Sequence, residues 1–175
     1  MLDASVAYNR YKFLGHEFLT WVWFMIENDP DSLTHESGQP VSLRIGNRII
    51  LENSRKEALE TVSIKANQSE LEEGRLALKK GAVVTEMNLH FRFNELLWTF
   101  DIKGESLAVS GVKVPETQSE EQADGLETSL LTQMEKYEML VSFLHNLYKQ
   151  FVKHRISRQW ETETASAIKK WISAA

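Results

Sequence analysis

The sequence predicts an α+β fold in which an antiparallel sheet of about five or six strands packs against helices from both ends of the chain. Between residues 81 and 114, apolar and polar residues alternate with a period of two, which is typical of strands with one buried face. Before and after the strands, apolar residues recur at helical spacing, within 13–27 and 126–174. A chain of 175 residues that is 42% hydrophobic has enough apolar material for the core of one domain, spanning 1–175.

The stretch from Gly81 to Val114 predicts a three-stranded meander, the second part of a sheet region that we place at 41–114. The residues expected on its buried face are Val83, Thr85, Met87, Leu89, Phe91 and Phe93, then Leu96, Trp98, Phe100 and Ile102, then Leu107 and Val109. Upstream, Gly46-Asn47 between two apolar runs indicates a hairpin turn, because both residues tolerate a positive φ. A further strand is expected around Val62 and Ile64.

Three helical regions complete the predicted fold. Residues 1–12 are expected to form a loose leader. The helix predicted at 13–27 is apolar on nearly every side, which is typical of a buried core helix. A short helix at 70–80 is predicted to begin with a capping box between Ser69 and Glu72 and to end at Gly81.

A polar, acidic loop at 115–125 precedes the C-terminal helices at 126–174. The first of these is long, because apolar residues recur at alternating steps of four and three. They are Leu130, Met134, Tyr137, Val141, Leu144, Tyr148 and Phe151. We expect this stripe to pack on the meander, with homodimerisation or the docking of a partner protein as a further use. A bend is expected near Ser157, followed by a shorter helix at 161–172.

Composition and motifs argue against several classes of function. The chain has no cysteine, so it has no disulfide or thiolate metal site, which fits a cytoplasmic protein. No segment reaches the about 20 apolar residues that span a membrane, and the N-terminus lacks a signal-peptide pattern. The five histidines form no pair at helical spacing, and no nucleophile or phosphate-loop motif is present. We therefore expect no metal, no cofactor, no small-molecule substrate and no enzymatic activity.

The charge is distributed unevenly, although the total is −5. Residues 116–138 carry seven acids and one lysine, whereas residues 145–175 carry six Lys or Arg against two Glu. Within residues 145–175, the residues expected to contact phosphate are Lys149, Lys153, Arg155 and Arg158. Secondary contacts are expected from three cations elsewhere in the chain, Lys79, Lys80 and Arg92. The alternative interpretation is that these cations complement a helix dipole and solvate the surface.

One acidic pattern suggests a third function. Asp101-Ile102-Lys103 at a strand end has the D-x-K form of a magnesium-dependent nuclease, with Glu86 on the neighbouring strand as the second carboxylate. The simpler interpretation is that Asp101 and Lys103 are the polar half of an alternating strand.

The predicted strands and the short helix before them also contain a pattern that is typical of a known protein family. The pattern consists of Glu72-Glu73, Gly81, Val83-Val84-Thr85, Leu89, Trp98 to Ile102, and Leu107. From about Val62 to Val114 this order resembles the C-terminal part of the bacterial recombination-associated protein RdgC family. The clear match covers about a third of the chain, and the family's N-terminal portion has no counterpart. Ala82 stands where family members carry Lys.

The resemblance implies a function that residue patterns alone do not supply. A member of that family is a cytoplasmic, non-enzymatic, dimeric protein that encircles double-stranded DNA without reading its sequence and modulates recombination. We therefore expect RdgC-like, sequence-independent DNA binding, with the structural or adaptor role of the long helix and the nuclease as alternatives.

Overall fold

The computed structural model describes residues 13–55, 58–65, 67–116 and 126–175. Its helices are α2 (Phe13–Asn28), α3 (Gln68–Lys79), α4 (Leu126–Arg155) and α5 (Ala165–Ser173), with a 3-10 turn at Pro30–Ser32 and a π-helical turn at Trp160–Thr164. Its strands are β1 (Ser42–Arg55), β2 (Ala58–Ile64), β3 (Val83–Phe93), β4 (Leu96–Lys103) and β5 (Val109–Lys113). The predicted leader at 1–12 and residues 117–125 of the predicted acidic loop lie outside the described residues.

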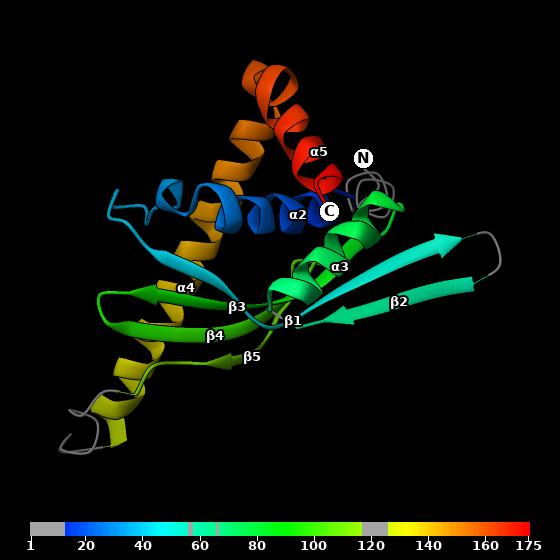
Figure 1. Ribbon diagram of the computed structural model, residues 1–175. Coiled ribbons are helices and arrows are strands. Elements are labelled where there is room, and N and C mark those ends of the chain that lie inside the picture. The colour runs from blue at the N-terminus through cyan, green and yellow to red at the C-terminus, as the bar shows by residue number, and fades with distance from the viewer. Residues whose placement is uncertain (1–12, 56–57, 66, 117–125) are drawn as a thin grey trace, which may run out of the picture.

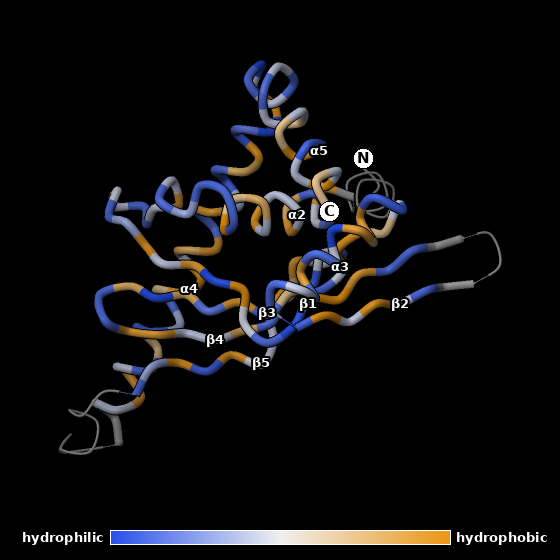
Figure 2. The backbone as a smooth tube through the Cα atoms, viewed as in Figure 1, coloured by the Kyte–Doolittle hydropathy of each residue, from blue (hydrophilic) through white to orange (hydrophobic). Residues whose placement is uncertain are grey.

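The five strands form one antiparallel sheet in the order β2-β1-β3-β4-β5, which confirms the predicted α+β class. Helices α2, α3 and α4 pack on the same face of the sheet (Figure 1). Apolar segments of these helices and of the central strands converge there (Figure 2). None of the helices that the structure describes covers the opposite face, and the candidate site lies there.

Helix α2 is the buried core helix that the sequence predicts. Trp23 is completely buried, and its ring meets Trp171 of α5 edge-on at a centroid distance of 5.3 Å. The Glu27 carboxylate accepts a hydrogen bond from the indole of each tryptophan, at 2.7 and 2.8 Å. Burying a large apolar side chain contributes about 1.5–3 kcal/mol, so α2 organises much of the core.

The start of α2 rests directly on the end of β4. The His16 Nδ1 atom lies 2.9 Å from the Val84 carbonyl oxygen, and the Gly104 amide donates to the Thr85 carbonyl. A Cβ atom on Gly15 would lie 1.6 Å from the Gly104 carbonyl oxygen. Glycine at position 15 is therefore what allows the helix and the strand end to approach so closely.

The predicted hairpin turn at Gly46-Asn47 is wrong. These residues bulge within the continuous strand β1, where the register shifts between Ile45 and Ile49, and the Asn47 amide donates to the Asn88 side chain at 3.0 Å. A Cβ atom on Gly46 would lie 1.9 Å from the Asn88 Oδ1 atom. The glycine therefore marks a close approach within a sheet rather than a turn, and the sheet has five strands, the lower of the two predicted numbers.

A second bulge corrects the predicted alternation at the start of β3. Ile50 pairs with Glu86 and Leu51 with Val84, so Thr85 is the extra residue. Its hydroxyl donates to the Ile50 carbonyl at 3.3 Å. Because the bulge reverses the alternation, Val84 is buried and Val83 is exposed, whereas Met87, Leu89, Phe91 and Phe93 are buried as predicted. Val109 of β5, which was also expected on the buried face, is exposed.

Helix α3 begins two residues earlier than predicted, and its cap is not the one expected. Asn67, rather than Ser69, accepts the amide of Glu70 at 3.0 Å. The Glu70 carboxylate accepts the backbone amide of Lys65 and, next in importance, the side-chain amide of Asn67, and these bonds lower the Glu70 pKa. The predicted end is confirmed, since Gly81 has a φ of 95° and the Ala82 amide bonds back to Ala77.

Helix α4 packs through a different face from the one predicted. Among its described side chains, the buried apolar ones are Leu140, Phe143, Leu147 and Phe151. Phe143 stacks on Phe91 of β3 at a centroid distance of 3.9 Å, and the Trp98 indole donates to the Lys136 carbonyl at 3.0 Å. Most of the predicted stripe, from Leu130 to Val141, is exposed. The predicted bend is confirmed, because α4 ends at Arg155 and a π-helical turn leads into α5.

Candidate nucleic-acid interface

The uncovered face of the sheet carries the polar residues of four strands. Because successive strand residues point to opposite faces, the neighbours of the buried positions all face away from the helices. They include Arg44 and Arg48 of β1, Glu86, Asn88, His90 and Arg92 of β3, Leu97, Thr99, Asp101 and Lys103 of β4, and Lys113 of β5. The sheet register arranges these side chains in rows that cross the strands.

One end of this face is cationic. Arg44, His90, Thr99 and Lys113 are successive cross-strand partners, so they form one row on four neighbouring strands. Arg92 lies in the next row, two residues along β3, between Ser42 and Leu97. Arg44, Arg92 and Lys113 are exposed, and none of them forms an ion pair with another described residue. We call Arg44, His90, Arg92 and Lys113 the cationic end of the sheet.

The middle of the face is electrically neutralised. The Arg48 guanidinium lies 2.5 Å from a Glu86 carboxylate oxygen and 3.9 Å from the Asp101 carboxylate. Asp101 also accepts the Asn88 side-chain amide at 2.9 Å. Within the described parts of the chain, no group of three or more His, Asp or Glu side chains is placed to hold a metal ion. The three residues of the nuclease hypothesis thus lie on adjacent strands, but an arginine lies between the two carboxylates.

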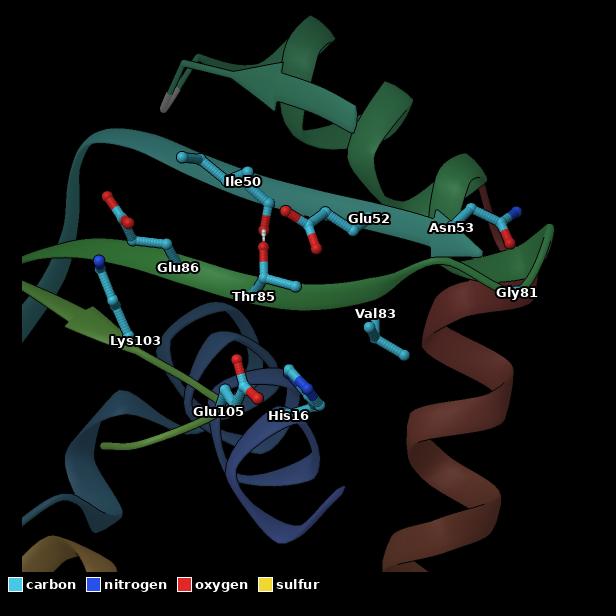
Figure 3. A pocket seen from close by; sticks show the side chains of 10 residues that line it. All are labelled: His16, Ile50, Glu52, Asn53, Gly81, Val83, Thr85, Glu86, Lys103 and Glu105. Atoms are coloured by element: carbon cyan, nitrogen blue, oxygen red, sulfur yellow. Dashed lines mark hydrogen bonds between the residues drawn. The ribbon is translucent and has the colours of Figure 1, made fainter. Parts of the chain in front are cut away.

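The other end of the face leads into an acidic hollow of about 520 Å³ (Figure 3). Glu52 and Glu86 approach it from the sheet, and His16 and Glu105 from the start of α2 and the turn after β4. Among the described residues that line it, Lys103 is the one lysine or arginine. With Glu86 paired to Arg48, two further carboxylates against one ammonium group still make this end less favourable for a polyanion than the cationic end.

The structure does not gather the seven cations predicted from the sequence on one surface. Lys149 and Lys153 are exposed on α4, and Arg158 is exposed beyond its end. Arg155 lies next to them in sequence, but its Nε donates to Glu17 at 2.7 Å and its guanidinium lies 5.1 Å from the Trp160 ring centroid. Arg155 therefore already has an internal partner.

The secondary contacts are divided between two regions. The Lys79 ammonium group donates to the carbonyls of Ser173 and Ala175, at 3.2 and 3.1 Å, while Lys80 is exposed beside it. Arg92 lies on the uncovered sheet face, away from the helices. The sequence-based prediction did not include Arg44 or Lys113. Arg44 could have been predicted, because it lies between the apolar residues Leu43 and Ile45 and therefore on the polar face of the strand.

Comparisons with known proteins add no assignment to this geometry. No protein-family model, no curated protein and no solved structure matches the chain. The RdgC resemblance therefore stays a prediction. Among the helices that the structure describes, none has the length and apolar character needed to cross a membrane.

Proposed function

We propose that the protein binds double-stranded nucleic acid without reading its sequence, and that the cationic end of the uncovered sheet face makes the contact. The observation that carries this proposal is the row of Arg44, His90 and Lys113, flanked by Arg92, on a face that none of the described helices covers. Arginine and lysine are the residues that bind phosphate most strongly. The proposal agrees with the function that the RdgC resemblance implies, but it uses a different surface from the basic helix end.

The spacing of the cations suits a phosphate backbone. Neighbouring strands are about 4.8 Å apart, so the row from Arg44 to Lys113 extends about 14 Å across the sheet. Arg44 and Lys113 lie at the two ends of this row. They can therefore contact different phosphates along the same nucleic-acid strand. No Phe, Tyr or Trp lies on this face in the described parts of β1, β3, β4 and β5. Without an aromatic platform for unstacked bases, a duplex held by its phosphates is favoured over a stacked single strand.

The distribution of charge along the uncovered sheet face predicts where the duplex lies. At one end the hollow is lined by the carboxylates of Glu52 and Glu105, which repel phosphate, while Glu86 beside them is paired with Arg48. The duplex therefore crosses β1, β3, β4 and β5 near Arg92 and Lys113, away from the hollow. Binding of this kind would act on DNA in the cytoplasm, and a recombination-associated role would rest on it.

Removing the cations of the sheet should weaken duplex binding and make it less sensitive to salt. The test variant combines Arg44→Ala, Arg92→Ala and Lys113→Ala. Each lost phosphate contact lowers the slope of log K against log salt by about 0.9, so the slope should fall by up to about 3. Fluorescence anisotropy with a labelled duplex, titrated at several salt concentrations, measures both quantities.

The matched control removes three exposed cations from the helices instead, through Lys149→Ala, Lys153→Ala and Arg158→Ala. This variant has the same net charge as the sheet variant and should keep the slope of the unmodified protein. A large loss in the helix variant alone would place the interface on α4. No binding by the unmodified protein at low salt would end the proposal. Thermal melting of each variant shows whether it is folded.

A further inference from the structure

The N-terminal half of α4 exposes a row of large apolar side chains. They are Leu130 (59% exposed), Leu131 (56%), Met134 (53%), Tyr137 (44%) and Val141 (64%), and we call them the α4 stripe. Apolar side chains gathered on one helix face, unlike scattered ones, mark an interaction surface. We propose that the α4 stripe docks an amphipathic helix of another protein, and that this partner helix carries Lys or Arg beside its apolar seam.

The spacing of the stripe is that of a helix-pairing seam. Leu130, Met134, Tyr137 and Val141 follow steps of four and three, as in the a and d positions of a heptad. The same seam continues through Leu144 and Tyr148, which are half-buried, and the Tyr148 ring meets Phe18 of α2 edge-on at 5.2 Å. The seam therefore packs against a helix of its own chain at one end, whereas at the other end none of the described helices covers it.

The stripe is presented by an anchored helix. On the opposite side of α4, Phe143 stacks on Phe91, and the Lys136 carbonyl accepts the Trp98 indole. These contacts hold α4 against the sheet and fix the stripe on its outer side. A partner helix would therefore dock on a preformed surface, so little entropy would be lost in ordering it.

The charges beside the stripe identify the chemistry of the partner. Between residues 128 and 145, the exposed charged side chains are Glu135 and Glu138, because Lys136 is buried and donates to the Pro115 carbonyl. A second copy of this chain would bring four carboxylates together around one seam, which is unfavourable. A helix flanked by Lys or Arg would instead pair with both glutamates. This surface lies on α4, so the proposal does not depend on nucleic-acid binding by the sheet.

Two synthetic helices test the proposal on the full chain. Both are labelled three-heptad peptides with Leu at the a and d positions, one with Lys and the other with Glu at the flanking positions. Fluorescence anisotropy should show that the Lys peptide binds about tenfold or more tightly than the Glu peptide. The double variant Met134→Gln/Val141→Gln should lose most of this affinity. The variant Glu135→Gln/Glu138→Gln should reduce the preference for the Lys peptide.

Ile156 provides the matched control, because it is 80% exposed but lies beyond the stripe. Ile156→Gln should bind the Lys peptide as the unmodified protein does. Equal affinities for the two peptides, or unchanged binding by Met134→Gln/Val141→Gln, would overturn the proposal. Light scattering tests the remaining alternative. A dimer that Met134→Gln/Val141→Gln converts to a monomer would also contradict the proposal. In that case a second copy covers the stripe.

Discussion

Replacing Gly15 with alanine should lower the free energy of unfolding by about 3 kcal/mol, although alanine favours an isolated helix. The added Cβ would lie 1.6 Å from the Gly104 carbonyl oxygen and 2.7 Å from its carbonyl carbon. Both atoms belong to the backbone, and Gly104 is itself held by the hydrogen bond from its amide to Thr85. The clash can therefore be relieved only by moving α2 away from the sheet, which opens the core around Leu19 and Trp23.

Urea unfolding followed by tryptophan fluorescence measures this effect. Gly74→Ala is the comparison, because its Cβ would meet the flexible end of the Ile64 side chain, at 2.4 Å from Cδ1, as well as Trp23 at 2.8 Å. A side-chain tip can shift, so the loss at Gly74 should be the smaller of the two. If helix propensity alone decided the outcome, Gly15→Ala would raise the stability by about 1 kcal/mol. An increase of that kind would contradict the observed packing of α2.

Truncating Phe143 to alanine should cost about 3–5 kcal/mol of stability, the range observed for buried aromatic residues. Phe143 is completely buried, and its ring lies nearly parallel to that of Phe91, at an interplanar angle of 7°. Its loss would remove the stacking contact between α4 and β3 and leave a cavity between the helix and the sheet. Far-UV circular dichroism during thermal unfolding measures the change.

Val141→Ala is the matched control on the same helix, two residues away. Val141 is 64% exposed, so its truncation should change the stability by no more than about 0.5 kcal/mol. The sequence periodicity predicts the reverse order, with Val141 on the buried stripe. A larger loss at Val141 than at Phe143 would show that α4 packs through the stripe.

The strands and the core helix are the parts of the fold that local pattern could predict. In β4, Trp98, Phe100 and Ile102 alternate with polar residues and are all buried. The apolar character of α2 on nearly every side predicted its burial. These features depend on neighbours in sequence, which is why periodicity finds them.

The errors arose where a distant contact decides between two local possibilities. Gly46-Asn47 has the composition of a turn, but the Asn88 side chain on β3 accommodates the bulge. Helix α4 has apolar residues on two faces, and Phe91 selects the one that includes Phe143. The periodicity of one segment contains no information about residues that are distant in sequence. It therefore favoured the face of α4 with the longer run of regularly spaced apolar residues, from Leu130 to Phe151.

The residues of the candidate site could be predicted only in part, for the same reason. The basic run at the end of α4 suggests a phosphate-binding patch, but Arg155 pairs with Glu17, which lies 138 positions away in sequence. Conversely, Arg44, Arg92 and Lys113 come from three separate strands, and only the sheet register brings them to one end of a face. Of these three, the sequence identified Arg92 alone.

The most direct test of the uncovered sheet face as the nucleic-acid interface is amide chemical-shift mapping by NMR. The ¹⁵N-labelled protein is titrated with a short DNA duplex at low salt. We predict that the largest shift changes fall on β1, β3, β4 and β5 around Arg44, His90, Arg92 and Lys113, and that they shrink as salt is added. Changes confined to the end of α4 and to α5, around Lys149, Lys153 and Arg158, would contradict the proposed interface.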